Sequence, residues 1–214
     1  FDPGFYRIVI FDQRGAGRSR PIASIVDNST DHLIADIEML RRHLNIENWL
    51  VFGGSWGSTL GLVYAIRHRQ QCLGLVLRGT FLGTDAEVAW FLTGMRAIFP
   101  EAWRRFSEFI PEAERGDLLS AYHSRLNDAR AEINLPAAAH WAGYETSCSN
   151  LLANPREDTP QPSGAALSLA RIEAHYFVNR SFLEEGYILK NIEKIRSIPA
   201  VLVQGRYDMV CPIV

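Results

Sequence analysis

Short apolar runs and helical repeats alternate along the first eighty residues of the chain. Tyr6–Phe11 is a continuous β-branched and aromatic run, typical of a strand buried on both faces. Trp49–Phe52 and Leu73–Leu77 predict two further strands. Apolar residues recur at helical spacing over Asp31–Leu44, and a second helix is predicted at Thr59–Arg67. Strands and helices that alternate with short connections predict a parallel sheet with right-handed crossovers.

The pattern changes after Thr80. From about residue 81 to residue 185 the chain is rich in Ala, Trp, Phe, Arg and Glu with helical periodicity, and three prolines mark Asn154–Gly164 as a loop. Strand character returns at Ala200–Gln204. Helices are predicted at Asp85–Ile98, Glu101–Ile110, Gly116–Asn127, Ala137–Leu152 and Ala165–Phe177.

An all-helical insertion in a parallel sheet predicts a cap over the active site, where substrate selection resides. We therefore expect a core at 1–80, a helical cap at 81–187 and the continued core at 188–214. Because a strand lies near each end of the chain, we expect the 214 residues to be an excerpt that lacks both ends of its domain.

Composition narrows the function classes. A net charge of −2 gives no sign of a nucleic-acid or anionic-membrane partner, and no apolar run reaches the roughly 20 residues of a membrane span. Cys72, Cys148 and Cys211 are widely spaced and form neither a disulfide framework nor a zinc pattern. With no visible signal peptide, these features favour a cytoplasmic protein without a metal or cofactor.

Gly53-Gly54-Ser55-Trp56-Gly57 carries the strongest chemical signal. A serine with glycine at minus two and plus two, between a strand and a helix, is the nucleophile-elbow pattern of acyl-transfer enzymes. The turn is so tight that side chains at the flanking positions are expected to clash with the backbone, and the helix N-terminus favours developing negative charge. The alternative is a glycine-rich turn with an incidental serine. The flanking strand and helix favour a nucleophile.

A serine nucleophile needs a base and an orienting carboxylate. Asp208 is the best carboxylate because it follows a late buried strand, although a simple turn aspartate would suit the same sequence. Every histidine precedes Asp208, whereas the chain order of this fold is Ser, Asp or Glu, then His. The base is therefore expected beyond residue 214, and the excerpt to be catalytically incomplete.

The oxyanion hole is expected to be half present. Its first donor is the backbone N–H of Trp56, and the second is expected on a strand before Phe1. Gly15-Ala16-Gly17 resembles the start of a dinucleotide fingerprint, but Arg20 replaces the third glycine and Pro21 precludes an immediate helix. Nucleotide binding is therefore not favoured.

Three strings together resemble the prolyl aminopeptidases, also called proline iminopeptidases, which are α/β-hydrolases with a helical cap. They are Phe11–Ser19, Gly53–Thr59 and Gly205–Pro212, and further similarity lies at Leu77–Phe81 and Ala170–Phe177. The resemblance implies removal of an N-terminal proline from peptides, with Ser55 as the nucleophile, Trp56 as oxyanion donor and Asp208 orienting a histidine outside the chain.

The resemblance also implies two cap glutamates that bind the free amine of the substrate, by position Glu145 and Glu173. Carboxylates in a partly desolvated pocket suit recognition of a cationic secondary amine. From the residues alone, an exposed position on a helix is favoured for each glutamate, and only the resemblance points to substrate binding. Tyr144 stands where the family usually has a second tryptophan. We also hypothesise that a bulky thiol reagent at Cys211, three residues after Asp208, disturbs the triad loop.

Other functions stay open at this stage. An esterase or amidase could use the same scaffold, since fold alone does not fix the substrate. Epoxide hydrolases and dehalogenases of this fold carry aspartate at the elbow, which Ser55 argues against. A hydrolase-fold binding protein without turnover is the alternative of a different class. The sequence leaves the oligomeric state and peptide length preference open.

Overall fold

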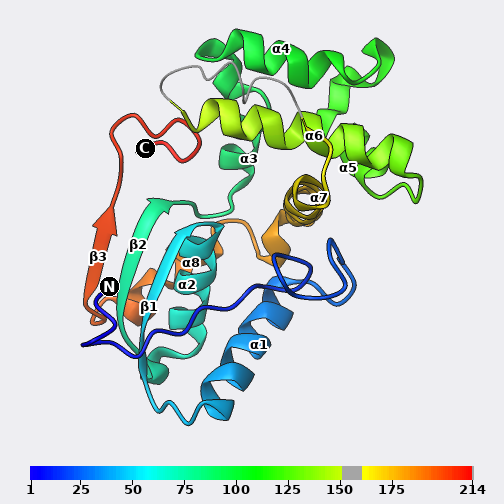
Figure 1. Ribbon diagram of the computed structural model, residues 1–214. Coiled ribbons are helices and arrows are strands. Elements are labelled where there is room, and N and C mark those ends of the chain that lie inside the picture. Colours follow the sequence, from blue (N-terminus) through cyan, green and yellow to red (C-terminus); the bar gives the residue numbers. More distant parts are fainter. Residues whose placement is uncertain (151–160, 214) are drawn as a thin grey trace.

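The chain forms a small parallel sheet with helices packed against one face and a layer of helices above its upper edge (Figure 1). This computed structural model describes residues 1–150 and 161–213. Residues 151–160 lie outside the described part, and with them most of the expected loop at Asn154–Gly164. The α-helices are α1 (Thr30–His43), α2 (Trp56–Arg67), α3 (Asp85–Leu92), α4 (Pro100–Glu108), α5 (Leu118–Leu126), α6 (Ala131–Cys148), α7 (Gly164–Val178) and α8 (Tyr187–Asn191). The strands are β1 (Trp49–Ser55), β2 (Cys72–Thr80) and β3 (Ala200–Val203). Short 3-10 turns occur at Arg69–Gln71, Gly94–Ala97, Glu112–Asp117, Arg180–Phe182 and Ile192–Ile195.

The three strands are parallel, in the order β1-β2-β3. Phe52 pairs with Val76, and Val76 pairs in turn with Val201. The parallel sheet expected from the sequence is therefore confirmed. Because the strands are parallel, their carboxyl ends meet at one edge, and Ser55 and Thr80 end two neighbouring strands there.

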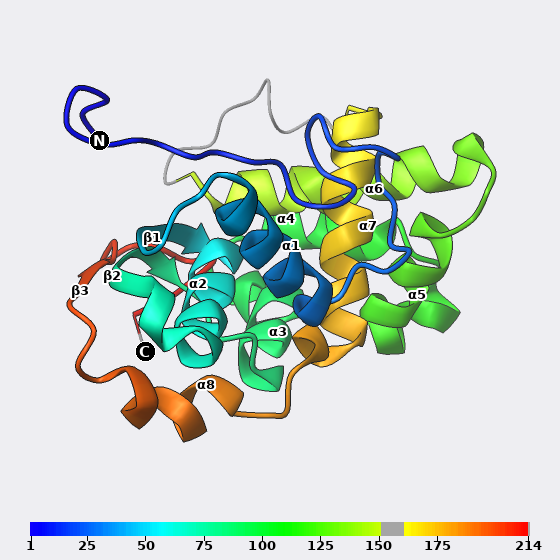
Figure 2. The same ribbon diagram turned by 90° about the horizontal axis from the view of Figure 1, so that it is seen from below.

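Helices α1, α2 and α8 lie on one face of the sheet (Figure 2). The ring of Tyr64 on α2 is 1% exposed and packs in this core with Leu75 and Leu77 of β2. Tyr64 also donates to the buried carboxylate of Glu38, to which Arg41 donates two hydrogen bonds of 2.8 Å each. A buried carboxylate is tolerated here because each of its oxygens has a donor.

The opposite face of the sheet is open. Phe52 is 60% exposed, and β3 is exposed along its whole length, with Leu202 at 63%. The expectation that β3 is a buried strand is therefore wrong for this structure. In the described residues β3 pairs only with β2 and forms the edge of the sheet, so one side of it has no neighbour.

Residues 6–11 do not form the expected strand. They run as irregular extended chain, and Ile10 is 81% exposed. A strand exists only where a neighbour satisfies its backbone groups, and within the described residues none of β1, β2 and β3 pairs with this segment. The apolar pattern indicates β-propensity, but strand formation also requires a neighbouring strand, which depends on the tertiary structure.

Helices α3 to α7, here called the upper helical layer, pack around Trp141, which is fully buried. Residues 85–98, expected as one helix, form α3 and then a 3-10 turn. Helix α6 begins at Ala131, six residues earlier than expected, with Pro136 inside it. The proline lies just beyond the first turn, and the helix continues through it at the loss of one backbone hydrogen bond.

Hydrogen bonds tie the upper helical layer to the sheet and its helices. Thr59 on α2 donates to the carbonyl of Phe81 at 2.6 Å, where the layer begins. Thr30, the first residue of α1, donates to the carbonyl of Ser181, where the layer ends. Both hydroxyl donors are fully buried. The layer is thus held at its two connections by buried contacts to α1 and α2.

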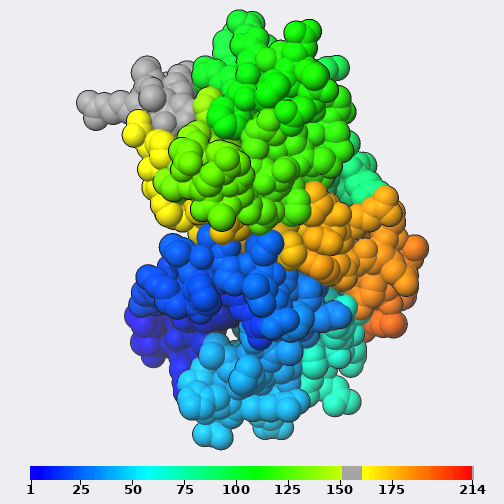
Figure 3. Space-filling view, turned by 90° about the vertical axis from the view of Figure 1, so that its right-hand side faces the viewer, coloured from blue at the N-terminus to red at the C-terminus, as the bar shows by residue number. Residues whose placement is uncertain are grey.

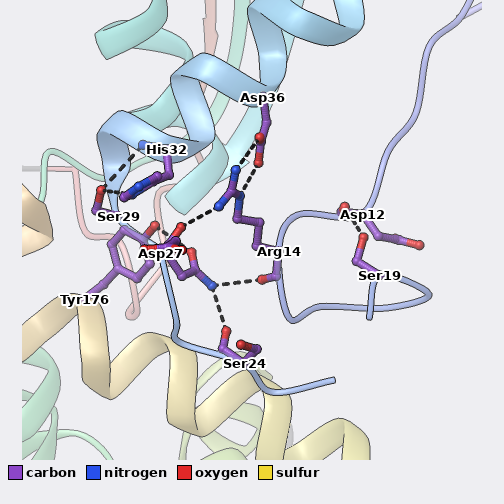
Figure 4. A network of polar contacts seen from close by, with 10 residues as sticks. Asp12, Arg14, Ser19, Ser24, Asp27, Ser29, His32, Asp36 and Tyr176 are labelled. Atoms are coloured by element: carbon purple, nitrogen blue, oxygen red, sulfur yellow. Dashed lines mark hydrogen bonds and ion pairs between the residues drawn. The ribbon is translucent and has the colours of Figure 1, made fainter. Parts of the chain in front are cut away.

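Residues 12–28, here called the N-terminal loop, lie directly beneath the upper helical layer (Figure 3). Arg14 forms a two-point ion pair with Asp36 of α1, at 2.6 and 2.7 Å, and also donates to the carbonyl of Asp27 (Figure 4). Asn28 donates to the carbonyl of Arg14 and accepts from the hydroxyl of Tyr176 on α7. The loop is therefore fixed against both α1 and α7. No helix follows it before Thr30, which agrees with the rejection of a dinucleotide fingerprint.

Candidate active site

Ser55 occupies a strained turn between β1 and α2. Its φ of 53° and ψ of −125° lie outside the regions that non-glycine residues normally adopt. Such strain persists only where the surrounding structure enforces it, and it is concentrated at functional sites. The strand-turn-helix context required of a nucleophile elbow is thus present.

The two glycines that flank Ser55, Gly53 and Gly57, differ in how much room a side chain would have. A Cβ on Gly53 would lie 2.0 Å from the carbonyl oxygen of Gly57, so no side chain fits at minus two. A Cβ on Gly57 would meet nothing within 4 Å. The expected clash at plus two is therefore wrong. Gly57 lies in the first turn of α2 and lines an open cavity, so a side chain there would occupy the cavity and would not strike backbone.

Asp208 is brought to the same sheet edge as Ser55 through Cys211. The Ser55 hydroxyl lies 3.9 Å from the Cys211 sulfur, and the backbone N–H of Cys211 donates to Asp208 Oδ1 at 2.9 Å. Gly79, at the end of β2, has φ of +54°, and a Cβ there would lie 3.2 Å from Asp208 Oδ2. Glycine at this position therefore leaves room for the carboxylate.

Sequence reasoning missed Gln204, which links the ends of two strands. Its side chain accepts from the N–H of Thr80 at 2.8 Å and donates to the carbonyl of Cys211 at 2.6 Å. The same amide donates to Asp208 over 3.5 Å. A glutamine directly after a strand, on the side where Asp208 was expected, was the available signal.

Histidine takes no part in this arrangement within the described residues. No hydrogen bond there joins a histidine to Ser55 or Asp208. His175 contacts the carbonyl oxygen of Asn28, and His32 contacts the hydroxyl of Ser29 at the start of α1. The expectation of a base beyond residue 214 therefore stays a prediction.

A cavity of about 620 Å³ opens at the elbow, between the sheet edge and the upper helical layer. This size is typical of small-molecule sites. Ser55, Trp56, Glu145 and Glu173 all line it. The structure thus brings together four of the five residues singled out from the sequence, and Asp208 lies behind Cys211. Aromatic and aliphatic side chains form much of the remaining wall, including Phe81, Phe91, Ile172, Tyr176, Phe177 and Val210.

Glu145 on α6 and Glu173 on α7 form a partly buried acidic pair that faces the cavity. Burial raises the pKa of Glu145 above its ordinary value. Burial also raises the pKa of Glu173, the nearby Glu145 charge raises it further, and the indole N–H of Trp141 counteracts both by donating to Glu173 at 2.5 Å. Within the described residues no lysine or arginine pairs with either carboxylate. Two such groups resist being ionised together, so a cation placed between them would be strongly favoured.

Tyr144 does not line the cavity. Its hydroxyl donates to the carbonyl of Phe91 at 2.8 Å, and its ring stacks on Phe106 at 4.5 Å. It is 2% exposed and belongs to the core of the upper helical layer. Tyrosine at this position therefore affects packing and leaves Glu145 facing the cavity.

Trp56 is the first residue of α2, and the N–H groups of a first helical turn have no partner within the helix. Its indole N–H donates to the side-chain oxygen of Gln13 at 3.1 Å, and its ring lies 4.5 Å from that of Tyr176. Trp56 directly follows Ser55 and lines the cavity, so its oxyanion role stays a prediction that this position in the helix allows.

The comparisons with known proteins agree with this geometry. A family model described as the alpha/beta hydrolase fold matches residues 5–213. The chain is 50% identical to a probable proline iminopeptidase of Leptolyngbya boryana, over 99% of the chain and 67% of that protein. It is 50% identical to a proline iminopeptidase of Arabidopsis thaliana, over 99% of the chain and 57% of that protein.

The solved structure of an esterase from Exiguobacterium antarcticum matches with a TM-score of 0.53 and 17% identity, over 94% of this chain and 64% of that one. At that identity the likeness concerns the fold alone. No helix among the described residues is long and apolar enough to cross a membrane. The elbow, the parallel sheet and the two close relatives together place this chain in the proline iminopeptidase family of the α/β-hydrolase fold.

Proposed function

We propose that the protein is a serine exopeptidase that releases N-terminal proline from peptides. One observation carries the proposal: a single cavity holds both the strained elbow serine and a partly buried pair of carboxyl groups whose pKa values are raised. A serine alone would suit an esterase. The acidic pair adds a reason to bind a cation, and the free amine of a peptide is the cation that lies next to a scissile carbonyl.

In the proposed mechanism Glu145 and Glu173 bind the protonated secondary amine, which places the adjacent carbonyl at Ser55. Attack of the serine oxygen forms a C–O bond, and the developing oxyanion accepts the N–H of Trp56. The C–N bond then breaks, the shortened peptide leaves with the proton taken from Ser55, and water hydrolyses the prolyl ester. Asp208 orients the histidine that carries this proton, which we place outside residues 1–214.

We further propose that residues 81–187 act as a cap that selects the substrate, between core segments 1–80 and 188–214. Both proposed amine ligands come from helices of this segment, whereas Ser55 comes from the core. Recognition and chemistry are therefore carried by different parts of the chain. The whole protein is proposed to be cytoplasmic and to need no metal or cofactor.

Three substrates test this function on the full-length protein: a proline anilide, an alanine anilide and a short-chain ester. We expect kcat/KM to be highest for the proline anilide. Preference for the ester would instead indicate an esterase, and no turnover of any substrate would indicate a binding protein. Ser55→Ala should abolish turnover while leaving the unfolding temperature within a few degrees of the wild type.

A further inference from the structure

Gln13 holds the side chain of the residue that follows the nucleophile. It lies in the N-terminal loop, lines the cavity, and accepts the indole N–H of Trp56 at 3.1 Å. Its neighbour Arg14 anchors the loop on α1 through Asp36. Gln13 therefore extends from a loop that is anchored on α1. Neither the acyl-transfer chemistry nor the amine recognition described above uses Gln13.

The same indole connects the elbow to helix α7. Its ring lies 4.5 Å from that of Tyr176, which is three residues after Glu173 on α7. Helix α7 also rests on the N-terminal loop, because Ser168 donates to the carbonyl of Gly15 at 2.7 Å and Tyr176 donates to Asn28 at 3.0 Å. Trp56 is thus held between the loop and the helix that carries Glu173.

We propose that Gln13 is a positioning residue that sets the distance from the amine-binding carboxyl groups to Ser55. This inference rests on the proposed function. In an N-terminal residue a single carbon separates the amine from the scissile carbonyl, so the substrate cannot absorb an error in that distance. A misplacement of about 1 Å can cost on the order of 10²-fold in rate.

The geometry separates this role from a role in the oxyanion hole. The backbone N–H of Trp56 is set by its place at the start of α2, which includes residues packed against the sheet core. Loss of the indole bond leaves that backbone in place but frees the ring that spaces α7 from the elbow. A substrate without an amine does not need the carboxylate of Glu173, so its hydrolysis depends much less on Gln13.

The test compares two variants of nearly equal size in the full-length protein. Gln13→Leu removes the acceptor, whereas Gln13→Glu keeps an oxygen for the indole N–H. Each is assayed with a proline anilide and with p-nitrophenyl acetate, which has no amine. Arg20→Leu, an exposed position of the same loop, is the matched control.

We expect Gln13→Leu to lower the anilide-to-ester ratio of kcat/KM at least fivefold, mainly through kcat for the anilide. Gln13→Glu should recover most of that ratio, and Arg20→Leu should not change it. Trp56→Phe removes the same hydrogen bond from the other side. Trp56→Phe should lower the ratio similarly, and the double variant Gln13→Leu with Trp56→Phe should lower it no further. Trp56→Phe alone also tests the proposal if Gln13→Leu does not fold.

Equal losses on both substrates, or an unchanged ratio, would overturn the positioning role. So would a Gln13→Glu variant no better than Gln13→Leu. Failure of the proposed function gives a different result, because the wild-type protein itself would then hydrolyse the ester and leave the proline anilide intact.

Discussion

Replacing Glu173 by glutamine separates substrate recognition from folding. The change keeps the volume of the side chain and an oxygen that can accept the indole N–H of Trp141, which now bonds Glu173 at 2.5 Å. It removes the negative charge from the cavity. The amine of the substrate then loses a charge-assisted hydrogen bond but gains no clash.

The size of the effect follows from that bond. Hydrogen bonds to charged groups contribute about 1.5–3 kcal/mol, and each 1.36 kcal/mol is a factor of about ten in rate. We therefore expect Glu173→Gln to lower kcat/KM for a proline anilide more than tenfold, by about 1.4 kcal/mol or more. The ester without an amine should lose less than threefold.

Stability should move the other way. Burial raises the pKa of Glu173 in the folded protein above its ordinary value, so its contribution to stability is present at low pH and is lost as pH rises through the raised pKa. At a pH above the ordinary pKa of a glutamate, Glu173 therefore lowers the stability of the folded protein. Glu173→Gln should leave the unfolding temperature at pH 7 unchanged or higher.

The same pKa predicts the pH profile. Below the raised pKa a neutral Glu173 attracts the cationic amine less, so kcat/KM of the wild type should fall as pH falls through it, and the variant should lose this limb. Glu132→Gln, an exposed position of α6, is the control and should match the wild type. An unchanged kcat/KM in Glu173→Gln would refute the assignment, as would a parallel loss in Glu132→Gln.

Two further predictions concern Cys211 and Glu38. Burial raises the pKa of the Cys211 thiol to about 11, so inactivation by N-ethylmaleimide should accelerate roughly tenfold per pH unit between pH 7 and 9. Unchanged inhibition of Cys211→Ser would disprove the thiol hypothesis. Arg41 and Tyr64 lower the pKa of Glu38 from 4.5 to about 2. Ionised Glu38 therefore contributes about 3 kcal/mol to the free energy of unfolding, and this contribution is present above pH 4.5 and is lost as pH falls towards 2. Urea unfolding of Glu38→Gln should therefore show a deficit at pH 7 that shrinks in acid, and a deficit independent of pH would contradict this account.

The sequence predicted most helices because their signals are local. The apolar repeats placed α1, α2 and α7 within a few residues of their observed ends, and the side chain of Ser29 caps α1. The elbow was also a local signal, since a strand, two glycines, a serine and a helix lie next to one another. Strand pairing is not local. Residues 6–11 had the composition of a strand and no partner for it among the described strands.

By itself, then, the sequence predicted most of the element order, the parallel sheet and the candidate nucleophile, because propensity, periodicity and motif spacing are properties of neighbouring residues. Only the tertiary structure decided that Glu145 and Glu173, on two different helices, share one cavity with Ser55. It also revealed the contacts of Gln13 and Gln204. The physical reason is common to all of these: distance, burial and charge coupling arise between segments that only packing brings together.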